Sequence, residues 1–293
     1  MSIDFKIAQD AKGMQPQILM HEAEPEAVLL HYPRLAETKM VKHCFTTRMG
    51  GVSEGEFAAM NLSFTRGDNE QAVKENYKRV AAAMGISYDR IVCSDQTHTT
   101  NVRKVTSADA GCGLTRERTY SDVDGLITDE PGLTLATFYA DCVPLYFVDT
   151  VHRAIGLSHS GWRGTVHRMG RVTIEAMGRE YKTDPKDIIC AIGPSICKDC
   201  YEVSADVAEE FIREFPSAVP ELLDDKKNGK YQLDLWEANR RVLLDAGVQE
   251  KNIIKPNICT CCNHDLLFSH RASHGRRGNL GAFLCIREAK TPM

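Results

Sequence analysis

The sequence predicts a single α/β (α+β) domain in which helices layer on a mixed β-sheet. Apolar, strand-like runs alternate with amphipathic helical segments along the chain. No internal repeat, low-complexity tract or linker interrupts this alternation, and 293 residues are enough to bury a large core. Residues 90–105 resemble two short strands around a turn, which predicts local antiparallel pairing and therefore a mixed sheet.

The N-terminal part of the chain carries the weakest pattern. We interpret residues 1–41 as a lead-in or an edge strand before a domain that spans residues 42–288. The first clear element is a helix predicted over residues 68–84. Apolar residues recur there at helical spacing, and Asp68 or Asn69 can cap the first turn.

The remaining elements follow from the same periodicity arguments. Apolar runs rich in β-branched and aromatic residues predict buried strands. These strands cover residues 133–148, 153–159, 188–192, 253–258 and 280–286. Apolar residues at helical spacing predict three more helices. These helices cover residues 164–181, 203–215 and 233–246.

Composition excludes several classes of protein. A net charge of −4 gives no electrostatic footprint for nucleic acid or an anionic membrane surface. No run approaches ~20 apolar residues, so we expect no membrane span. The polar start of the chain shows no secretory leader, and 11 cysteines then predict reduced thiols in a cytoplasmic protein. We expect a monomer or a homodimer.

Two histidines and a cysteine lie at the edges of the predicted strands. His98 falls in a polar turn, Cys142 inside an apolar run, and His159 at the end of a strand. Two imidazoles and a thiolate match a zinc site with one open coordination position, as a catalytic zinc requires. Taken singly, a loop histidine is usually solvated and a cysteine in an apolar strand is usually a small buried residue. Spacing alone does not decide between these interpretations.

An ordered series of motifs supports the metal-site interpretation. The motifs are Thr46–Ser53, Gln96–His98, Thr137–Pro144, His159–Gly164 and Ile192–Ile196. With them, the chain resembles the multicopper polyphenol oxidase (laccase-domain) family, also called the purine nucleoside phosphorylase or peptidoglycan editing factor family. The resemblance runs from about residue 42 to residue 286 and implies the cysteine-hydrolase-like fold of that family. It also implies a metal held by His98, Cys142 and His159, with zinc expected and copper as the alternative.

The same resemblance implies residues that contact substrate. Arg48 follows two threonines and precedes a glycine pair, and the resemblance makes it an active-site residue that could bind an anion. Asn61 is expected on the same wall of the pocket. Tyr139 stands where the family commonly has threonine, so we expect it to line or back the pocket. We therefore predict that Arg48, Asn61 and Tyr139 bind substrate.

Carboxylates complete the predicted chemistry. Asp124 and Asp141 can each hold a histidine tautomer or move a proton. Asp141 lies in an otherwise core-like run, where a carboxylate is costly unless it is paired. We take Arg48, Asp141 and Cys142 as the catalytic candidates.

A second zinc would have to come from two cysteine-containing segments, Cys197–Cys200 and Cys259–Cys262. We do not interpret them as a clean pair of CxxC ligand motifs. Only Cys200, Cys259 and Cys262 stand where the resembled family often has cysteine or another small residue. We therefore expect one zinc per chain, and the roles of these cysteines stay open.

Four functions compete. The resemblance implies a zinc-dependent enzyme that phosphorolyses adenosine, inosine and S-methyl-5'-thioadenosine and deaminates adenosine, so its partners would be purine nucleosides and phosphate. A laccase-like copper polyphenol oxidase is the second, although 10 histidines without a His-x-His pair disfavour a multicopper cluster. The third is a peptidoglycan precursor editing amidase, which could use a zinc-bound water or a Cys142–His159 nucleophile pair. The fourth, a non-enzymatic binding module, is disfavoured by the open metal position.

Overall fold

Two six-stranded β-sheets packed face to face form the centre of the structure, a computed structural model that describes residues 5–6, 17–20 and 27–288. The strands of the first sheet are, in spatial order, β1 (Gln17–Met20), β2 (Val28–His31), β3 (Val41–Thr46), β15 (Leu280–Ile286), β7 (Thr134–Tyr139) and β4 (Ile91–Cys93). All neighbours in this sheet are antiparallel except β7 and β4.

The second sheet has the same number of strands. They are, in spatial order, β14 (Ile253–Ile254), β10 (Ile188–Ile192), β8 (Val143–Asp149), β9 (Ala154–Ser160), β6 (Gly125–Thr128) and β5 (Val102–Lys104). The two outer pairs of strands are parallel and the inner ones antiparallel. Both sheets are therefore mixed. The sequence predicts a mixed sheet, although it predicts only one.

Alternation along β8 shows why the second sheet is buried on both faces. Val143, Leu145 and Phe147 join the apolar cluster on the helical side, whereas Tyr146 and Val148 join the cluster between the two sheets. Successive side chains of a strand point to opposite faces, so an uninterrupted apolar run is what a strand covered on both sides requires.

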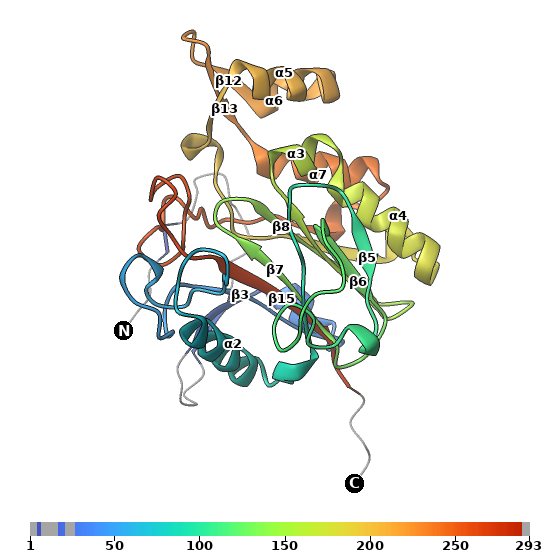
Figure 1. Ribbon diagram of the computed structural model, residues 1–293. Coiled ribbons are helices and arrows are strands. Elements are labelled where there is room, and N and C mark those ends of the chain that lie inside the picture. Colours follow the sequence, from blue (N-terminus) through green and yellow to red (C-terminus); the bar gives the residue numbers. More distant parts are fainter. Residues whose placement is uncertain (1–4, 7–16, 21–26, 289–293) are drawn as a thin grey trace.

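Helices cover the outer faces of the two sheets (Figure 1). Helix α2 (Glu70–Met84) packs its apolar stripe on the first sheet. On the second sheet lie α3 (Trp162–Val166), α4 (Met169–Tyr181) and α7 (Leu235–Asp245). The order of layers is therefore helix, sheet, sheet, helix.

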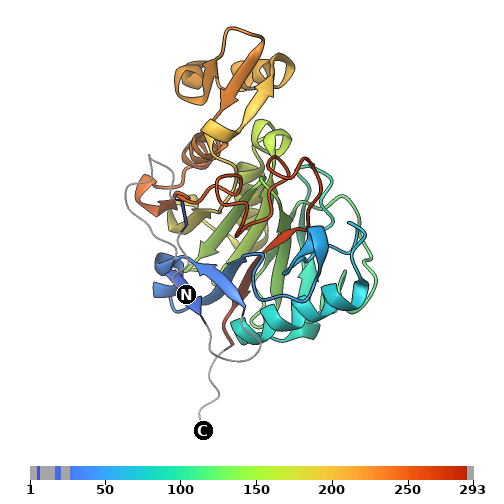
Figure 2. The ribbon, with the colours of Figure 1, turned by 90° about the vertical axis from the view of Figure 1, so that its left-hand side faces the viewer.

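A small lobe projects from the helical side of the second sheet, at the top of Figure 1. Figure 2 shows the same lobe after a rotation of the molecule about the vertical axis. Its elements are β11 (Glu202–Ser204), α5 (Ala205–Glu214), α6 (Val219–Leu222), β12 (Leu223–Asp225) and β13 (Lys230–Leu233). The three strands form their own sheet in the order β11-β13-β12. Val207, Phe211 and Leu222 join the same apolar cluster as α4 and α7, so the lobe shares the core of the domain.

Short elements complete the described chain. They are α1 (Pro33–Glu37) and the 3-10 turns Gly55–Phe57, Tyr88–Arg90, Ser107–Asp109, Pro185–Asp187, Lys198–Cys200, Pro216–Ala218 and Glu250–Asn252. None of the helices in the described ranges has the length and apolar character needed to cross a membrane.

The mixed α/β class is confirmed, and several elements match their predicted positions. Strands β10 and β15 have the predicted bounds. Helix α2 begins after Asn69, whose side chain accepts hydrogen bonds from the backbone N–H groups of Gln71 and Ala72. The predicted lead-in contributes β1 and β2 to the edge of the first sheet, and its residues 1–4, 7–16 and 21–26 lie outside the described residues.

Three predictions about the elements were wrong. The expected single sheet is two large sheets, besides the small third sheet of the lobe. The run 133–148 breaks after Tyr139 into β7 and β8, which belong to different large sheets. Strands β4 and β5 do not pair with each other; each pairs in parallel with a later strand, one in each sheet. The predicted helix 164–181 is interrupted at Arg168, whose φ of 57° lies in the left-handed region.

Other bounds shifted by a few residues. The segment 203–215 starts as strand β11 before α5 begins, and the run 253–258 forms only the short strand β14. In both places a short apolar stretch is compatible with either state, and tertiary packing decides.

Candidate functional site

The crossing between the two sheets places Cys142. Strand β7 ends at Tyr139 in the first sheet and β8 begins at Val143 in the second. Asp141, in between, adopts a φ of 87°, a strained conformation for a residue other than glycine. In the antiparallel pair β8–β9, Pro144 is opposite His159, so the register brings His159 next to Cys142.

His98 comes from the loop between β4 and β5, and Asp124 holds that loop. The buried carboxylate of Asp124 accepts hydrogen bonds from the backbone N–H groups of Thr97, His98 and Thr99 at 2.9–3.2 Å. The φ of His98 is 67°, again in the left-handed region. The backbone of this loop is therefore held by hydrogen bonds to one carboxylate rather than by those of a helix or a strand.

The structure brings the three predicted ligands together. One ligand atom from each of His98, Cys142 and His159 lies within 4.8 Å of the other two. The two imidazole rings are 5.0 Å apart between centroids and nearly perpendicular. His159 is buried, Cys142 is half-buried and His98 is exposed, so the group has a closed side and an accessible side.

Gly161 leaves the space that this group needs. A Cβ atom built on Gly161 would lie 3.1 Å from the sulfur of Cys142 and 3.2 Å from the His98 ring. Both distances are tight for a Cβ atom, so a side chain here would press on two of the three ligands.

The orientation of His159 is set by Asp124. The Nδ1 atom of His159 lies 2.7 Å from Oδ1 of Asp124. With that nitrogen donating, the other ring nitrogen is free to bind a metal, an arrangement typical of metal-ligating histidines. Burial alone would raise the pKa of Asp124, but the hydrogen bond and charge of His159 outweigh it and lower that pKa.

The electrostatics of the metal-free site favour the thiolate of Cys142. Burial by itself would raise the pKa of the thiol, yet the charges and hydrogen bonds of His159 and His98 lower it to about 6. Burial likewise opposes the charged form of His159, but the Cys142 thiolate and Asp124 raise its pKa to about 9. Because the thiolate is the form of cysteine that binds metals, the donor set fits a zinc ion.

The three ligands line a cavity of about 1060 Å³. The partly exposed residues Phe64, Tyr120 and Phe138 form part of its wall, and Arg66 and Arg277 form another part. A cavity with apolar rings and a few placed polar groups is typical of a small-molecule site.

Arg277 is a functional candidate that sequence reasoning missed. It is 8% exposed, and its Nη1 donates to the carbonyl of Gly278 at 3.2 Å and to the side chain of Asn279. Its Nε atom has no hydrogen-bond partner among the described residues. Burial and then the charge of Arg66 lower its pKa to about 10. No local sequence pattern singles out Arg277, since its burial and its unpartnered Nε appear only in the folded structure.

Arg48 and Asn61 do not line the cavity. The Nε and Nη1 atoms of Arg48 donate to the carbonyls of Ala58 and His264 at 2.8 and 2.9 Å, and its guanidinium lies 4.8 Å from the Phe268 ring centroid. These contacts tie loops together, which is a structural role. The prediction that Arg48 is the anion site is thus not supported by its position.

Asn61 is buried and fully engaged. Its side-chain nitrogen donates to the Ser63 carbonyl and to the Asp68 carboxylate, and its side-chain oxygen accepts from the backbone N–H of Asn279. Asn61 therefore positions Asn279, which does line the cavity.

Tyr139 lines the cavity and backs the ligand His159, whose ring centroid is 5.6 Å away. Its hydroxyl lies 2.8 Å from Oγ1 of Thr137 and 3.0 Å from the Ser158 carbonyl. The hydroxyl is therefore occupied within the protein.

Asp141 does not line the cavity either. Its two carboxylate oxygens accept hydrogen bonds from the hydroxyl of Thr260 at 2.6 Å and from the backbone N–H of Arg271 at 2.7 Å. This pairing explains how a carboxylate is tolerated between two core strands. These hydrogen bonds fix the turn that directly precedes Cys142.

A second group of metal-ligating side chains lies outside the cavity. The sulfur atoms of Cys197, Cys200, Cys259 and Cys262 lie within 4.8 Å of one another. The interpretation of these segments as something other than paired CxxC motifs was wrong, because residues 197 and 200, and residues 259 and 262, each have the CxxC spacing. The additional Cys261 obscured that spacing.

Comparison with known proteins identifies the family. Residues 42–287 match the profile of the family described as multi-copper polyphenol oxidoreductase laccase. The chain belongs to this family. Among its relatives is purine nucleoside phosphorylase YlmD from Geobacillus stearothermophilus, 39% identical over 247 residues that cover 84% of this chain and 90% of YlmD.

Two further similarities bear on activity and fold. Adenosine deaminase RL5 from an unknown prokaryotic organism is 34% identical over 78% of this chain and 87% of its own length. The crystal structure of protein YfiH from Bacillus licheniformis superimposes with a TM-score of 0.84 at 34% identity, covering 92% of this chain and 99% of that one. The laccase-family fold is therefore shared along nearly the whole described chain.

Proposed function

We propose that this protein is a zinc-dependent purine nucleoside enzyme that phosphorolyses adenosine, inosine and S-methyl-5'-thioadenosine and also deaminates adenosine. The observation that carries the proposal is the open His98–Cys142–His159 group on the wall of a cavity that also presents a buried arginine. Family relatives named as purine nucleoside phosphorylases and as an adenosine deaminase support the choice of substrate class.

His98, Cys142 and His159 would hold the metal. Three protein ligands and one accessible side match a catalytic zinc site rather than a structural one. When bound, zinc would supply Lewis-acid chemistry and lower the pKa of a water molecule. Asp124 would keep the His159 ring oriented and Gly161 would leave the ligands free to close on the ion.

Phosphate would bind at Arg277. Its unpartnered Nε is a hydrogen-bond donor held in a nearly buried position, and the nearby charge of Arg66 adds to the attraction for an anion. In phosphorolysis, a phosphate oxygen forms a bond to C1' of the ribose as the bond from C1' to the purine nitrogen breaks. The released purine takes up a proton, which gives the free base and ribose 1-phosphate.

The aromatic wall would bind the purine. Phe64 stacks on Tyr77 with centroids 5.7 Å apart, and it is a partly exposed lining residue of the cavity. Phe138 is held by Gln96, which makes hydrogen bonds to both its backbone N–H and its backbone carbonyl at 2.6–2.7 Å. Fixed aromatic rings stack on any purine, which agrees with activity on several nucleosides.

Other reactions of the same cavity are less well supported. For a laccase-like oxidase, the described residues offer one group with two histidines and one cysteine, and a second group with four cysteines. Neither set resembles a multicopper cluster, which needs many imidazoles. An amidase using Cys142 as a nucleophile would compete with metal binding for the same sulfur atom.

Product analysis tests the proposal. Pure protein is incubated with adenosine and phosphate, and the products are separated. Adenine with ribose 1-phosphate is expected, together with some inosine from deamination. Cleavage of a peptidoglycan precursor, or oxidation of a phenol, with no nucleoside turnover would overturn it. The Cys142→Ala variant, prepared in parallel, controls for contaminating phosphorylases.

A further inference from the structure

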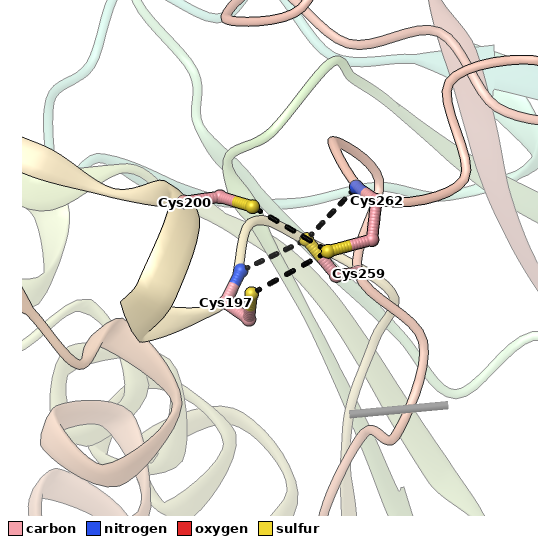
Figure 3. A group of neighbouring side chains, drawn as sticks. All are labelled: Cys197, Cys200, Cys259 and Cys262. Atoms are coloured by element: carbon pink, nitrogen blue, oxygen red, sulfur yellow. Dashed lines mark hydrogen bonds between the residues drawn. The ribbon is translucent and has the colours of Figure 1, made fainter. Parts of the chain in front are cut away.

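The four-cysteine group joins two loops at the base of the small lobe. Cys197 and Cys200 follow strand β10, and the chain enters the lobe directly after Cys200. Cys259 and Cys262 follow strand β14, the parallel neighbour of β10, and residue 259 bridges to Ser195. Figure 3 shows the four side chains converging from these two loops.

The separations of the sulfur atoms suit a metal. The sulfur of Cys262 lies 4.0 Å from that of Cys197 and 3.4 Å from that of Cys200. In a tetrahedral zinc–thiolate site with bonds of about 2.3 Å, neighbouring sulfur atoms are about 3.8 Å apart. A disulfide would need about 2.05 Å. The observed separations lie around the value for the tetrahedral site.

Backbone hydrogen bonds are already directed at one of the sulfur atoms. The N–H groups of Cys197 and Cys262 donate to the sulfur of Cys259 at 3.2 and 3.4 Å. Without a metal, the hydrogen bond with the Cys197 side chain and burial raise the pKa of the Cys259 thiol. The two backbone donors act in the opposite direction, because hydrogen bonds to an ionised acceptor are stronger than those to a neutral one. Figure 3 draws both contacts.

The chemistry of the group identifies the ion and its role. We propose that Cys197, Cys200, Cys259 and Cys262 bind a structural zinc ion in addition to the metal of the open site. Four thiolates from two CxxC pairs complete a tetrahedral shell and leave no position for substrate. Cys197 and Cys259 are buried, and none of the four residues lines the cavity.

The zinc would fasten the loops that support the open site. Ile196, next to Cys197, donates its backbone N–H to the carbonyl of Asp141 at 3.0 Å. Thr260, next to Cys259, donates its hydroxyl to the carboxylate of Asp141 at 2.6 Å. Asp141 directly precedes the ligand Cys142. The closed site therefore stabilises the strained turn that carries one ligand of the open site.

Metal counting tests the inference on the full-length chain, purified under reducing conditions without added metal. We expect two zinc ions per wild-type chain, and one in each of the variants Cys142→Ala and Cys200→Ser. Cys261→Ser is the matched control, because this cysteine lies in the same segment but outside the group, and it should keep both ions. A wild-type chain with one zinc ion, which Cys142→Ala loses, would overturn the proposal.

Cobalt substitution gives an independent readout. Its main arm uses Cys142→Ala, in which all four cysteines of the closed group are intact. Chains of Cys142→Ala refilled with Co²⁺ should keep an intense thiolate-to-cobalt absorption band, and Cys200→Ser should lose most of it. Loss of the band in Cys142→Ala, or disulfides among the four cysteines in the freshly reduced protein, would contradict the site. These outcomes do not depend on the proposed nucleoside activity, so the two proposals can fail separately.

Discussion

The two cysteine-containing groups of this protein differ in how completely their side chains would surround a metal. His98, Cys142 and His159 supply three ligands and line a large cavity, whereas Cys197, Cys200, Cys259 and Cys262 supply four and lie outside that cavity. Three ligands leave a coordination position for a reacting molecule, and four thiolates leave none. The comparison teaches that the presence of cysteine does not by itself distinguish a catalytic metal site from a structural one. The number of ligands and their access to the cavity make that distinction in this fold.

The two groups also differ in how they are supported. The open group depends on one buried carboxylate, Asp124, which binds the His98 loop and the His159 ring together. The closed group depends on backbone N–H groups of its own loops. We therefore expect substitutions around the open group to change activity at nearly constant stability, and substitutions in the closed group to change stability first.

The largest effect is expected from Cys142→Ala. Turnover of adenosine should fall at least about 1000-fold, because a catalytic metal contributes several kcal/mol and each ~1.4 kcal/mol is a factor of ten. The melting temperature should change little, since the core of the two sheets does not depend on this ion. Steady-state kinetics and thermal unfolding check both. If the variant kept all its metal and lost activity, Cys142 would instead be a nucleophile.

A smaller effect is expected from Asp124→Asn. The amide cannot accept the hydrogen bonds of the loop and of His159 in the same way, so metal affinity or turnover should fall about 10- to 100-fold. Asp122→Asn is the matched control, because Asp122 accepts a hydrogen bond from the Thr97 side chain and is exposed. Competition with a metal chelator measures the affinity. Equal effects of the two substitutions would contradict the role of Asp124 in holding the His98 loop and the His159 ring.

The anion site is tested by Arg277→Gln. The KM for phosphate should rise about tenfold or more, since charge-assisted hydrogen bonds contribute ~1.5–3 kcal/mol and ~1.4 kcal/mol is a factor of ten. Arg277→Lys should recover only part of this, because an ammonium group lacks the planar fork. The control is Arg276→Gln, whose exposed guanidinium pairs with Glu56.

Arg48→Ala completes this experiment. From its contacts with backbone carbonyls we expect it to leave the response to phosphate unchanged. A rise in the KM for phosphate in Arg48→Ala but not in Arg277→Gln would return the anion site to Arg48, as the sequence predicts.

The smallest effect is expected from Gly161→Ala. The added methyl group would crowd Cys142 and His98, and crowding of ~1 kcal/mol corresponds to roughly a fivefold loss of metal affinity. Gly164→Ala is the control, because a Cβ atom there meets its nearest neighbour at 3.5 Å, an ordinary contact. Zinc titration of the two apo-proteins compares them. Indistinguishable affinities would show that the open group can relax around a side chain at position 161.

Sequence reasoning anticipated the local elements better than their assembly. Strand β15 and helix α2 follow from apolar periodicity and a capping side chain, which are encoded within a few residues. The division of 133–148 between two sheets depends on contacts with distant strands, and no local pattern specifies it. Asp141 was the visible sign of the break, because its carboxylate finds partners only where the chain leaves the sheet.

The candidate site shows the same limit. His98, Cys142 and His159 could be selected through family motifs, although they are far apart in the chain. Arg277 could not, because what singles it out is its burial with an unpartnered Nε beside the cavity. The role of Arg48 stays a prediction, since an arginine near glycines looks the same in sequence whether it binds an anion or, as its contacts here show, backbone carbonyls.

The central claim is that the metal of the open group serves activity and the metal of the closed group serves stability. Stepwise removal of metal from the wild-type chain tests this claim most directly. A chelator is added in increments, and zinc content, adenosine phosphorolysis and the melting temperature are measured on the same samples. We expect activity to disappear with the first zinc ion while the melting temperature stays nearly constant. Release of the second should then lower it by roughly 10 °C, since a few kcal/mol shift Tm by ~2–4 °C per kcal/mol in a chain of this size. Activity that persists after both ions are gone, or activity and stability that fall together with a single ion, would contradict the account.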